Sequence, residues 1–205
     1  MKRSYGKLLV AASIPLMIAA EPAVTLAANC TGDGTPTKAA TIAPGAKVNR
    51  TARIGAGTEI GPNVTIGRRV HIGTCSTIGI PAGTVSIATK ASLGDGVTIN
   101  SGSVARDGRV GDGSTLDGTS VGVKARVGAN ATVTNTIIAP YAWTGDAVTM
   151  GGVAGVYVGR YAAIKSTVDV PLHIGDSVSI GAYACVGTDV SDDAVIPNRF
   201  NYGCY

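Results

Sequence analysis

The sequence predicts an all-β fold in which one short unit repeats along the chain. Aliphatic residues recur at every sixth position, which fits neither a lone helix nor a lone half-buried strand. Glycine or alanine follows most of these aliphatics, and a small or β-branched residue stands four positions after each of them. The 29 glycines and the 4% aromatic content argue against an ordinary α/β core, which would use more Phe and Trp. The repeating aliphatics are Ile42, Val48, Ile54, Ile60, Ile66, Ile72 and Ile78, and the small residues are Ala46, Ala52, Thr58, Val64, Val70, Ser76 and Ala82.

These repeats, as in RIGAGT, EIGPNV, TIGRRV and HIGTCS, resemble those of the hexapeptide-repeat superfamily. The resemblance implies a left-handed parallel β-helix, a solenoid with three flat sides and about 18 residues per coil. One aliphatic from each side fills the axis, and the small residue four positions later fits the corner. We expect the glycine after each aliphatic to let the backbone turn without a steric penalty from Cβ. A single coil cannot bury its apolar face, so its neighbours complete the core.

Residues 1–28 have the features of a secretory signal peptide. Lys2, Arg3 and Lys7 precede an apolar run over residues 8–20, and small residues follow it. The run is shorter than the roughly 18 to 20 residues that cross a bilayer, which disfavours the alternative of a retained membrane anchor. We expect cleavage near Ala27 or Ala28 and a mature chain that does not span the membrane. Export would place it in the periplasm, at the cell surface or in the medium.

The mature chain is long enough for one domain. Residues 29–40 are expected to lead into the solenoid and cap its first coil, and residues 41–188 to form the β-helix. Residues 189–205, which end in RFNYGCY, leave the pattern. We expect Phe200, Tyr202 and Tyr205 to cap the last coil, because an open coil exposes apolar side chains and strand edges.

The repeat contains irregularities that predict local structure. The step from Ile78 to Ile87 is three residues longer than six, which predicts a loop over residues 80–85. Steps of five at three equivalent places predict coils of 17 residues that stack in register. The pattern is weak over residues 139–156, where we expect it to continue through Thr144 and Met150, and it breaks at residues 168–172. The aliphatics after the loop are Leu93, Ile99, Val104, Val110, Leu116, Val121, Val127, Val133 and Ile138, and after the weak stretch Val158, Ile164, Ile174, Ile180 and Val186.

Four cysteines remain after cleavage, an even number in a compartment that permits disulfides. Spacing alone does not fix their pairing. Because each pair lies near one end of the predicted solenoid, we expect Cys185 to pair with Cys204 and Cys30 with Cys75.

Resemblance to the superfamily also suggests acyl transfer, with a histidine base at a cleft in a homotrimer and the donor on coenzyme A or acyl carrier protein. His71 and His173, the two histidines, each precede a core aliphatic in VHIGTC and LHIGDS and are expected on the outer surface. Either could act as a base. Neither stands in a motif that matches the catalytic histidine of the family, and the acyl donors are cytoplasmic, so we expect no cofactor.

A metal site is not expected. The γ-class carbonic anhydrases share the scaffold and bind zinc through three histidines of adjacent subunits, whereas His71 and His173 lie several coils apart. The isolated pair of His71 and Cys75 is not expected to bind a metal either, because Cys75 is expected to form a disulfide.

A basic column follows from the coil register. The residues that precede the third aliphatic of successive coils should form a ladder on one face. Two interpretations stay open: a solvated face, or a flat basic strip ending in an aromatic residue that binds an anionic polymer such as an acidic polysaccharide. The column comprises Arg53, His71, Ser92, Arg109, Arg126 and, by extrapolation, Trp143, with Arg50 and Arg68 as a second stacked pair.

The mature chain is nearly balanced in charge, because three of the 17 Lys and Arg residues and one of the 13 Asp and Glu residues fall in the signal peptide. Net charge therefore gives no case for nucleic-acid binding. Some left-handed β-helices bind ice through outward threonines, but the outward threonines here do not make an unbroken two-column lattice. We interpret them as ordinary strand-favouring residues; they are Thr65, Thr77, Thr98, Thr115 and Thr132.

The sequence therefore favours an exported, non-catalytic β-solenoid that is structural or adhesive. Its partner would be an anionic polysaccharide or another surface protein. The alternative is an enzyme similar to the hexapeptide-repeat acyltransferases, with His71 or His173 as base.

Overall fold

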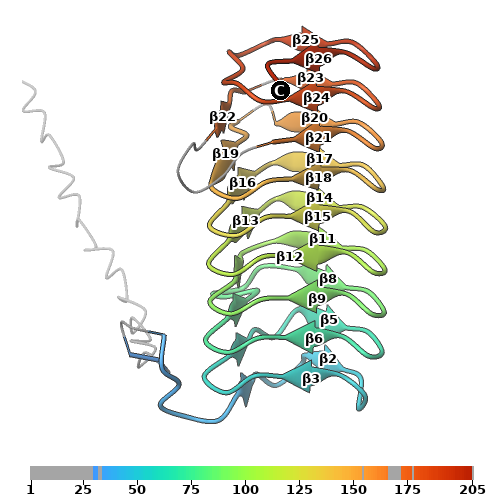
Figure 1. The fold of residues 1–205 in the computed structure, drawn as a ribbon. Helices are drawn as coiled ribbons and strands as arrows, with labels where there is room; N and C mark the ends of the chain where they lie inside the picture. The colour runs from blue at the N-terminus through green and yellow to red at the C-terminus, as the bar shows by residue number, and fades with distance from the viewer. Residues whose placement is uncertain (1–29, 32–33, 154, 166–171, 177, 205) are drawn as a thin grey trace, which may run out of the picture.

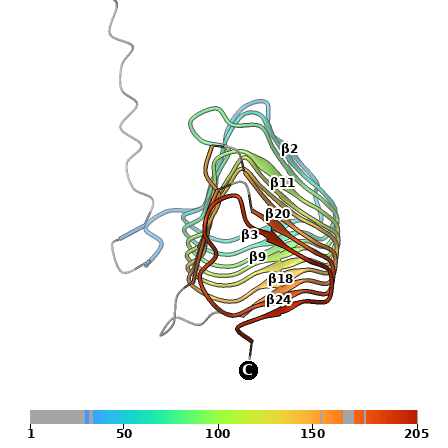
Figure 2. The ribbon, with the colours of Figure 1, turned by 90° about the horizontal axis from the view of Figure 1, so that it is seen from above.

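The computed structural model describes residues 30–31, 34–153, 155–165, 172–176 and 178–204. The predicted signal peptide lies outside these residues. The described chain winds as a parallel β-helix whose coils stack along one axis (Figure 1). Seen along that axis, the coils have a three-sided outline (Figure 2). The predicted all-β solenoid is therefore confirmed, and no part of the described chain is helical.

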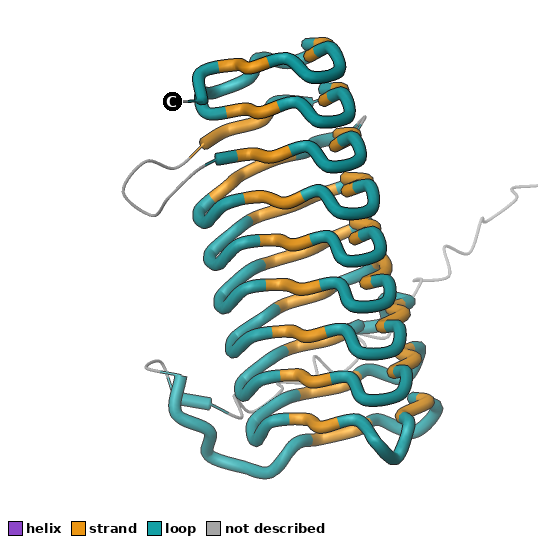
Figure 3. The backbone as a smooth tube through the Cα atoms, turned by 45° about the vertical axis from the view of Figure 1, so that its right-hand side comes forward, coloured by secondary structure: helices purple, strands orange, loops and turns teal. Residues whose placement is uncertain are grey.

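Short strands separated by turns make up each coil (Figure 3), and they align into three parallel sheets. The first sheet contains β1 (Thr41–Ile42), β4 (Glu59–Ile60), β7 (Thr77–Ile78), β10 (Thr98–Ile99), β13 (Thr115–Asp117), β16 (Thr132–Thr134), β19 (Val148–Met150) and β22 (Leu172–Ile174). The second sheet contains β2 (Lys47–Val48), β5 (Val64–Ile66), β8 (Val85–Ile87), β11 (Gly102–Val104), β14 (Thr119–Val121), β17 (Thr136–Ile138), β20 (Val156–Val158), β23 (Ser179–Ile180) and β25 (Val195–Ile196). The third sheet contains β3 (Arg53–Ile54), β6 (His71–Ile72), β9 (Ser92–Leu93), β12 (Arg109–Val110), β15 (Arg126–Val127), β18 (Trp143–Thr144), β21 (Ala163–Ile164), β24 (Cys185–Val186) and β26 (Asn201–Tyr202).

The core is the predicted column of inward aliphatics. Ile60, Ile66 and Ile72 are each at most 2% exposed. The weak stretch continues as predicted, because Thr144 and Met150 are also buried. Ile42, predicted to fill the axis, is instead 48% exposed, since it belongs to the first coil and lies at the end of its sheet.

The loop after Ile78 is present and changes one predicted position. Ala82, expected in a corner, is exposed. Val85 takes the buried position instead and pairs with Val64 of the coil below. Later coils repeat every 17 residues as predicted, since Val110 pairs with Val127. Of the predicted break, residues 168–171 lie outside the described chain, and β22 begins at Leu172.

The glycine after each aliphatic has a different role from the one expected. At Gly111 the backbone does not have a positive φ, but an added Cβ would lie 2.5 Å from the Ala129 nitrogen of the next coil. Positive φ values occur two positions later, as at Gly113. At Gly111, glycine is therefore required by the close approach of stacked coils, and the turn itself is made at another residue.

The prediction that residues 189–205 leave the repeat is wrong for the described residues 189–204. Val190 forms a parallel bridge with Ile174, and β25 and β26 extend the second and third sheets. The six-residue rule missed this coil because Val190 follows Val186 by only four residues. Phe200 and Tyr202 are 48% and 40% exposed, and Tyr205 lies outside the described residues.

Both predicted disulfides are present. Cys30 is bonded to Cys75 and ties the N-terminal lead-in to the corner between the third and first sheets. Cys185 is bonded to Cys204 and fastens the last coil to β24.

Candidate functional site

The third sheet carries the basic column predicted from the coil register. Parallel pairing places Arg53 beside His71, and then Ser92, Arg109, Arg126 and Trp143 follow in consecutive coils. Adjacent strands lie about 4.8 Å apart, so the side chains form one row along the axis. Apart from the half-buried Ser92, these side chains are exposed. We call these six residues the third-sheet column.

A second set of cations lies at the corner between the second and third sheets, and sequence analysis identified only two of them. Backbone hydrogen bonds link the successive coils here; for example, the Lys124 N–H donates to the Arg106 carbonyl over 3.0 Å. The predicted pair of Arg50 and Arg68 stands in register, because Val48 pairs with Ile66. We call this set the basic corner: Arg50, Arg68, Arg69, Lys90, Arg106, Lys124, Arg160 and Arg199.

Three tyrosines continue the basic corner towards the C-terminus. Tyr141, Tyr161 and Tyr183 stack in consecutive coils, with ring centroids 4.9 Å apart in both pairs. The Lys124 Nζ lies 5.4 Å from the Tyr141 centroid, and the Arg160 guanidinium lies 5.2 Å from that of Tyr161. Each tyrosine stands three positions after a core aliphatic, so the sequence contains a spacing signal for this stack.

Charge is segregated around the solenoid. Among the described residues, every Lys and Arg except Lys38, Lys47 and Lys165 belongs to the basic corner or the third-sheet column. Every described Asp and Glu except Asp107 lies elsewhere. Balanced net charge therefore conceals one strongly basic edge.

Several carboxylates on the other edges have structural partners in the next coil. Asp95 accepts a hydrogen bond from the Thr74 N–H over 2.6 Å, and Asp112 accepts one from the Asp95 N–H over 3.0 Å. Asp192 does the same for the Asp176 N–H over 2.8 Å. By contrast, Arg109 and Arg126 have no carboxylate partner within the described part of the chain.

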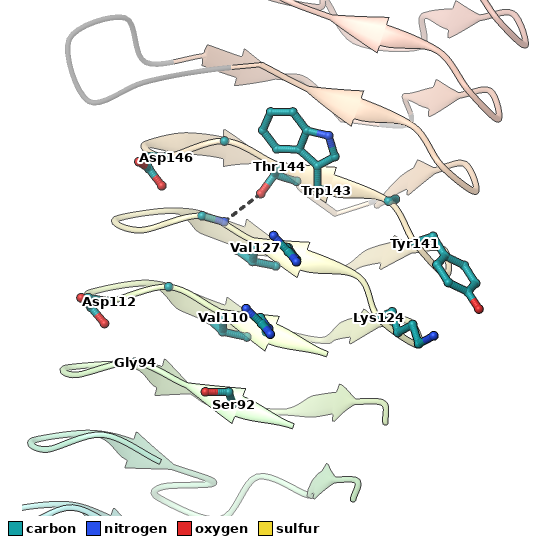
Figure 4. A pocket seen from close by; sticks show the side chains of 16 residues that line it. Ser92, Gly94, Val110, Asp112, Lys124, Val127, Tyr141, Trp143, Thr144 and Asp146 are labelled. Carbon is teal, nitrogen blue, oxygen red and sulfur yellow. Dashed lines mark hydrogen bonds between the residues drawn. The ribbon is translucent and has the colours of Figure 1, made fainter. Parts of the chain in front are cut away.

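An open groove of about 950 Å³ lies over the third sheet where the two basic sets meet. Arg109, Arg126 and Lys124 line it together with Tyr141 and Trp143. Two carboxylates line its opposite side: Asp112 accepts a hydrogen bond from the Asp95 N–H over 3.0 Å, and Asp146 accepts one from the Ala129 N–H over 2.7 Å. Figure 4 shows Lys124 and Tyr141 at the corner end of the strands, and the indole of Trp143 rising from its strand. Small residues such as Gly111 and Gly128 form the floor of the groove. The charged and aromatic side chains extend from the rigid strands and turns beside them.

The two histidines are not brought together. His71 lies on the third sheet beside Arg53, and His173 lies on the first sheet in register with Thr149. Both are exposed, and the backbone N–H of His173 donates to Asp189 over 2.8 Å. Within the described ranges no three His, Cys, Asp or Glu side chains lie close enough to hold a metal ion. The described part of the chain also contains no helix that could cross a membrane.

The outward threonines form one column and not two. Thr77, Thr98, Thr115 and Thr132 stack on the first sheet, and Thr149 extends them. Thr65 lies apart, on the second sheet beside Ser86. The residues two positions after the stacked threonines are mixed in type, namely Gly79, Asn100, Asp117, Thr134 and Gly151.

Comparison with known proteins identifies the fold. Residues 45–79 match the family described as bacterial transferase hexapeptide (six repeats). The solved structure of LpxA from Acinetobacter baumannii has 17% identity and a TM-score of 0.56, with 77% of this chain and 64% of that chain covered. This chain thus spans less than two thirds of that protein. A UDP-N-acetylglucosamine acyltransferase is similar at 17% identity and a TM-score of 0.53, with 78% and 70% covered.

At this identity the likeness concerns the fold, and it confirms the left-handed β-helix built from hexapeptide repeats. A comparison with proteins of curated function finds no match.

Proposed function

Because the chain belongs to the hexapeptide-repeat superfamily, whose scaffold is not tied to one activity, we propose that it is a non-catalytic solenoid that binds an anionic polysaccharide. The ligand lies along the third-sheet column and the basic corner. The observation that carries this proposal is the charge segregation. Cations gather on one edge, and the described carboxylates other than Asp107 lie elsewhere.

The basic edge suits a long, flexible polyanion. From Arg50 to Arg199 the corner runs through the whole stack of coils, a length of roughly 40 Å at about 4.8 Å per coil. A row of like charges with low-dielectric walls concentrates the field and attracts counter-charged polymers. The field decays within about 8 Å at physiological ionic strength, so the ligand must lie against the surface.

The test is binding of the mature chain to polygalacturonate at physiological salt. The double variant Arg109→Glu with Arg126→Glu removes two attractions and adds two repulsions. At about 0.5 kcal/mol for each exposed pair, the affinity should fall by about 2 kcal/mol, or roughly 30-fold. Binding should also weaken as salt is added.

A matched control changes net charge equally but away from the site. Lys38→Glu with Lys47→Glu lies off the basic edge and should lower affinity less than about threefold. An equal loss in both double variants, or no loss in either, would contradict the proposal.

Two disulfides support an exported location, since such bonds persist in oxidising compartments. The predicted signal peptide points the same way. Fractionation of the native host should place the protein outside the cytoplasm, with the mass of a chain that begins near Asn29. Recovery in the cytoplasm at full length would contradict this part of the proposal.

Acyl transfer is the second candidate, favoured by the transferase family match and by two acyltransferases with this fold. In this case the chain assembles as a homotrimer, and His71 or His173 acts as the base. Light scattering would give the oligomeric state. Transfer from acetyl coenzyme A to an acceptor amine or sugar that is lost in His71→Ala or His173→Ala would favour the enzyme; a monomer without such transfer would favour the binding scaffold.

A further inference from the structure

We propose that the groove over β15 and β18 binds one acidic sugar unit, with its pyranose ring against Trp143 and its carboxylate at Arg126 and Lys124. This inference rests on the proposed polysaccharide binding. It identifies the sugar unit of the polymer that binds in the groove.

The groove lies where the third-sheet column changes from cationic to aromatic side chains. Arg109 and Arg126 are followed by Trp143, which pairs with Ala163 of the next coil. Trp143 is 40% exposed although Trp usually buries most of its large apolar surface. Because Ala163 is small, the coil above leaves space beside the indole. Figure 4 shows the ring directed towards that coil.

Two consecutive coils contribute matched pairs of side chains to the groove. One coil supplies Lys124 and Arg126, and the next supplies Tyr141 and Trp143. Arg126 and Trp143 are in direct register, and Lys124 Nζ lies 5.4 Å from the Tyr141 centroid. The groove therefore offers two cations on one level and two aromatic side chains on the level about 4.8 Å above.

An acidic pyranose fits this arrangement. Its C–H face packs on an indole, and a carboxylate at its edge accepts two parallel hydrogen bonds from a guanidinium. The ring is comparable in size to the spacing of two coils, so one unit can reach both levels. The volume of about 950 Å³ lies within the range of sites for small ligands and leaves room for the neighbouring units of the chain.

A nucleic acid fits less well. Binding of a single strand uses several separate aromatic platforms for successive bases. Here the faces of Tyr141, Tyr161 and Tyr183 cover one another at 4.9 Å, which leaves Trp143 as the single open platform among the described groove residues.

The experiment uses the tryptophan itself, since the chain contains one Trp and its fluorescence reports on the groove alone. Titration of the mature chain with trigalacturonate should change the Trp143 emission with saturation. Maltotriose, a neutral trisaccharide, should leave the emission unchanged. Arg126→Gln should weaken the trigalacturonate response at least tenfold, whereas Lys47→Gln, outside the groove, should match the wild type.

A sulfated trisaccharide distinguishes the anionic group, and a weaker response to it than to trigalacturonate supports a carboxylate site. Unchanged emission at saturating trigalacturonate, with polygalacturonate still bound, would overturn the groove assignment and leave the proposed function standing. If the wild-type chain bound neither trigalacturonate nor polygalacturonate, the proposed function would be wrong as well. An equal emission change with oligothymidylate would overturn the choice of a sugar.

Discussion

Replacing Gly111 with alanine tests why glycine follows the aliphatics of the third sheet. In six consecutive coils this position is glycine, whereas alanine occurs three times at the equivalent position after the second sheet. At Gly111 an added Cβ would lie 2.5 Å from the Ala129 nitrogen and 2.6 Å from the Gly128 carbonyl carbon. All of these neighbours are backbone atoms and cannot rotate away. The six glycines are Gly55, Gly73, Gly94, Gly111, Gly128 and Gly145, and the three alanines are Ala88, Ala105 and Ala139.

The size of the effect follows from the distances. Ordinary contact begins at 3.4 Å, so the two coils must separate locally by roughly 1 Å. Overpacking of this kind costs about 1–3 kcal/mol. The separation also weakens the 2.9 Å hydrogen bond from the Gly111 N–H to the Val127 carbonyl, worth about 1 kcal/mol. We expect Gly111→Ala to lower the free energy of unfolding by about 3 kcal/mol and the melting temperature by about 6–12 °C.

Gly96→Ala is the matched control. Gly96 has a φ of 63°, but the nearest atom to an added Cβ is 3.9 Å away. Ala147 occupies the equivalent turn position with a φ of 54°, so alanine is tolerated at this corner. We expect a loss of about 1 kcal/mol. Thermal denaturation followed by circular dichroism measures both variants, and a Gly96→Ala loss as large as that of Gly111→Ala would refute the close-approach explanation.

Two further predictions concern the C-terminal coils. Replacing Cys185 and Cys204 with serine removes a link across a sequence separation of 19, and should lower the free energy of unfolding by about 3 kcal/mol in urea titrations; an unchanged midpoint would show that the last coil holds without it. Tyr161→Ala removes two stacked ring pairs and should cost about 2 kcal/mol, whereas Tyr161→Phe should cost less than about 0.5 kcal/mol; equal losses would argue that the hydroxyl and not the stack is responsible.

The sequence predicted the fold because one physical rule, inward aliphatics six apart, governs most coils. The rule succeeds even at Thr144, which is polar yet buried, because its hydroxyl accepts a hydrogen bond from the Gly128 N–H over 3.3 Å. It fails at Val190, where a side is shortened by two residues and the register depends on pairing with Ile174. Spacing along the chain does not encode such pairing.

The candidate site was predicted in part. The third-sheet column followed from counting, since five members precede a core aliphatic and Trp143 precedes the buried Thr144. The cations of the basic corner stand two or three positions after a core aliphatic, and the stacked tyrosines stand three positions after one. Their proximity across coils depends on the same register. The groove could not be predicted, because its shape depends on the small side chain of Ala163 and on the direction of the Trp143 ring as well as on the register.

Residue choice at the corners supports the proposal that the basic edge binds a ligand. The turn residue three positions after the aliphatic has a positive φ at two of the corners, with values near 60° in most coils. This conformation strains residues other than glycine and is easiest for Gly and Asn. Between the third and first sheets the described turn residues with this conformation are Gly57, Cys75, Gly96, Gly113, Asn130 and Ala147, whereas between the second and third sheets they are Arg69, Lys90, Asp107, Lys124, Tyr141, Tyr161, Tyr183 and Arg199.

The same backbone thus carries small residues at one corner and, apart from Asp107, long cations or aromatics at the other. Stacked like charges add a further cost, because Arg109 and Arg126 stand in direct register on neighbouring strands. Ser92 and Ala163 occupy the same column, so the sheet accepts neutral residues there. Arg109 and Arg126 thus add repulsion to the sheet, and the proposed anionic ligand would neutralise their charge. Ligand binding should therefore raise the melting temperature most at low salt, where that repulsion is least screened.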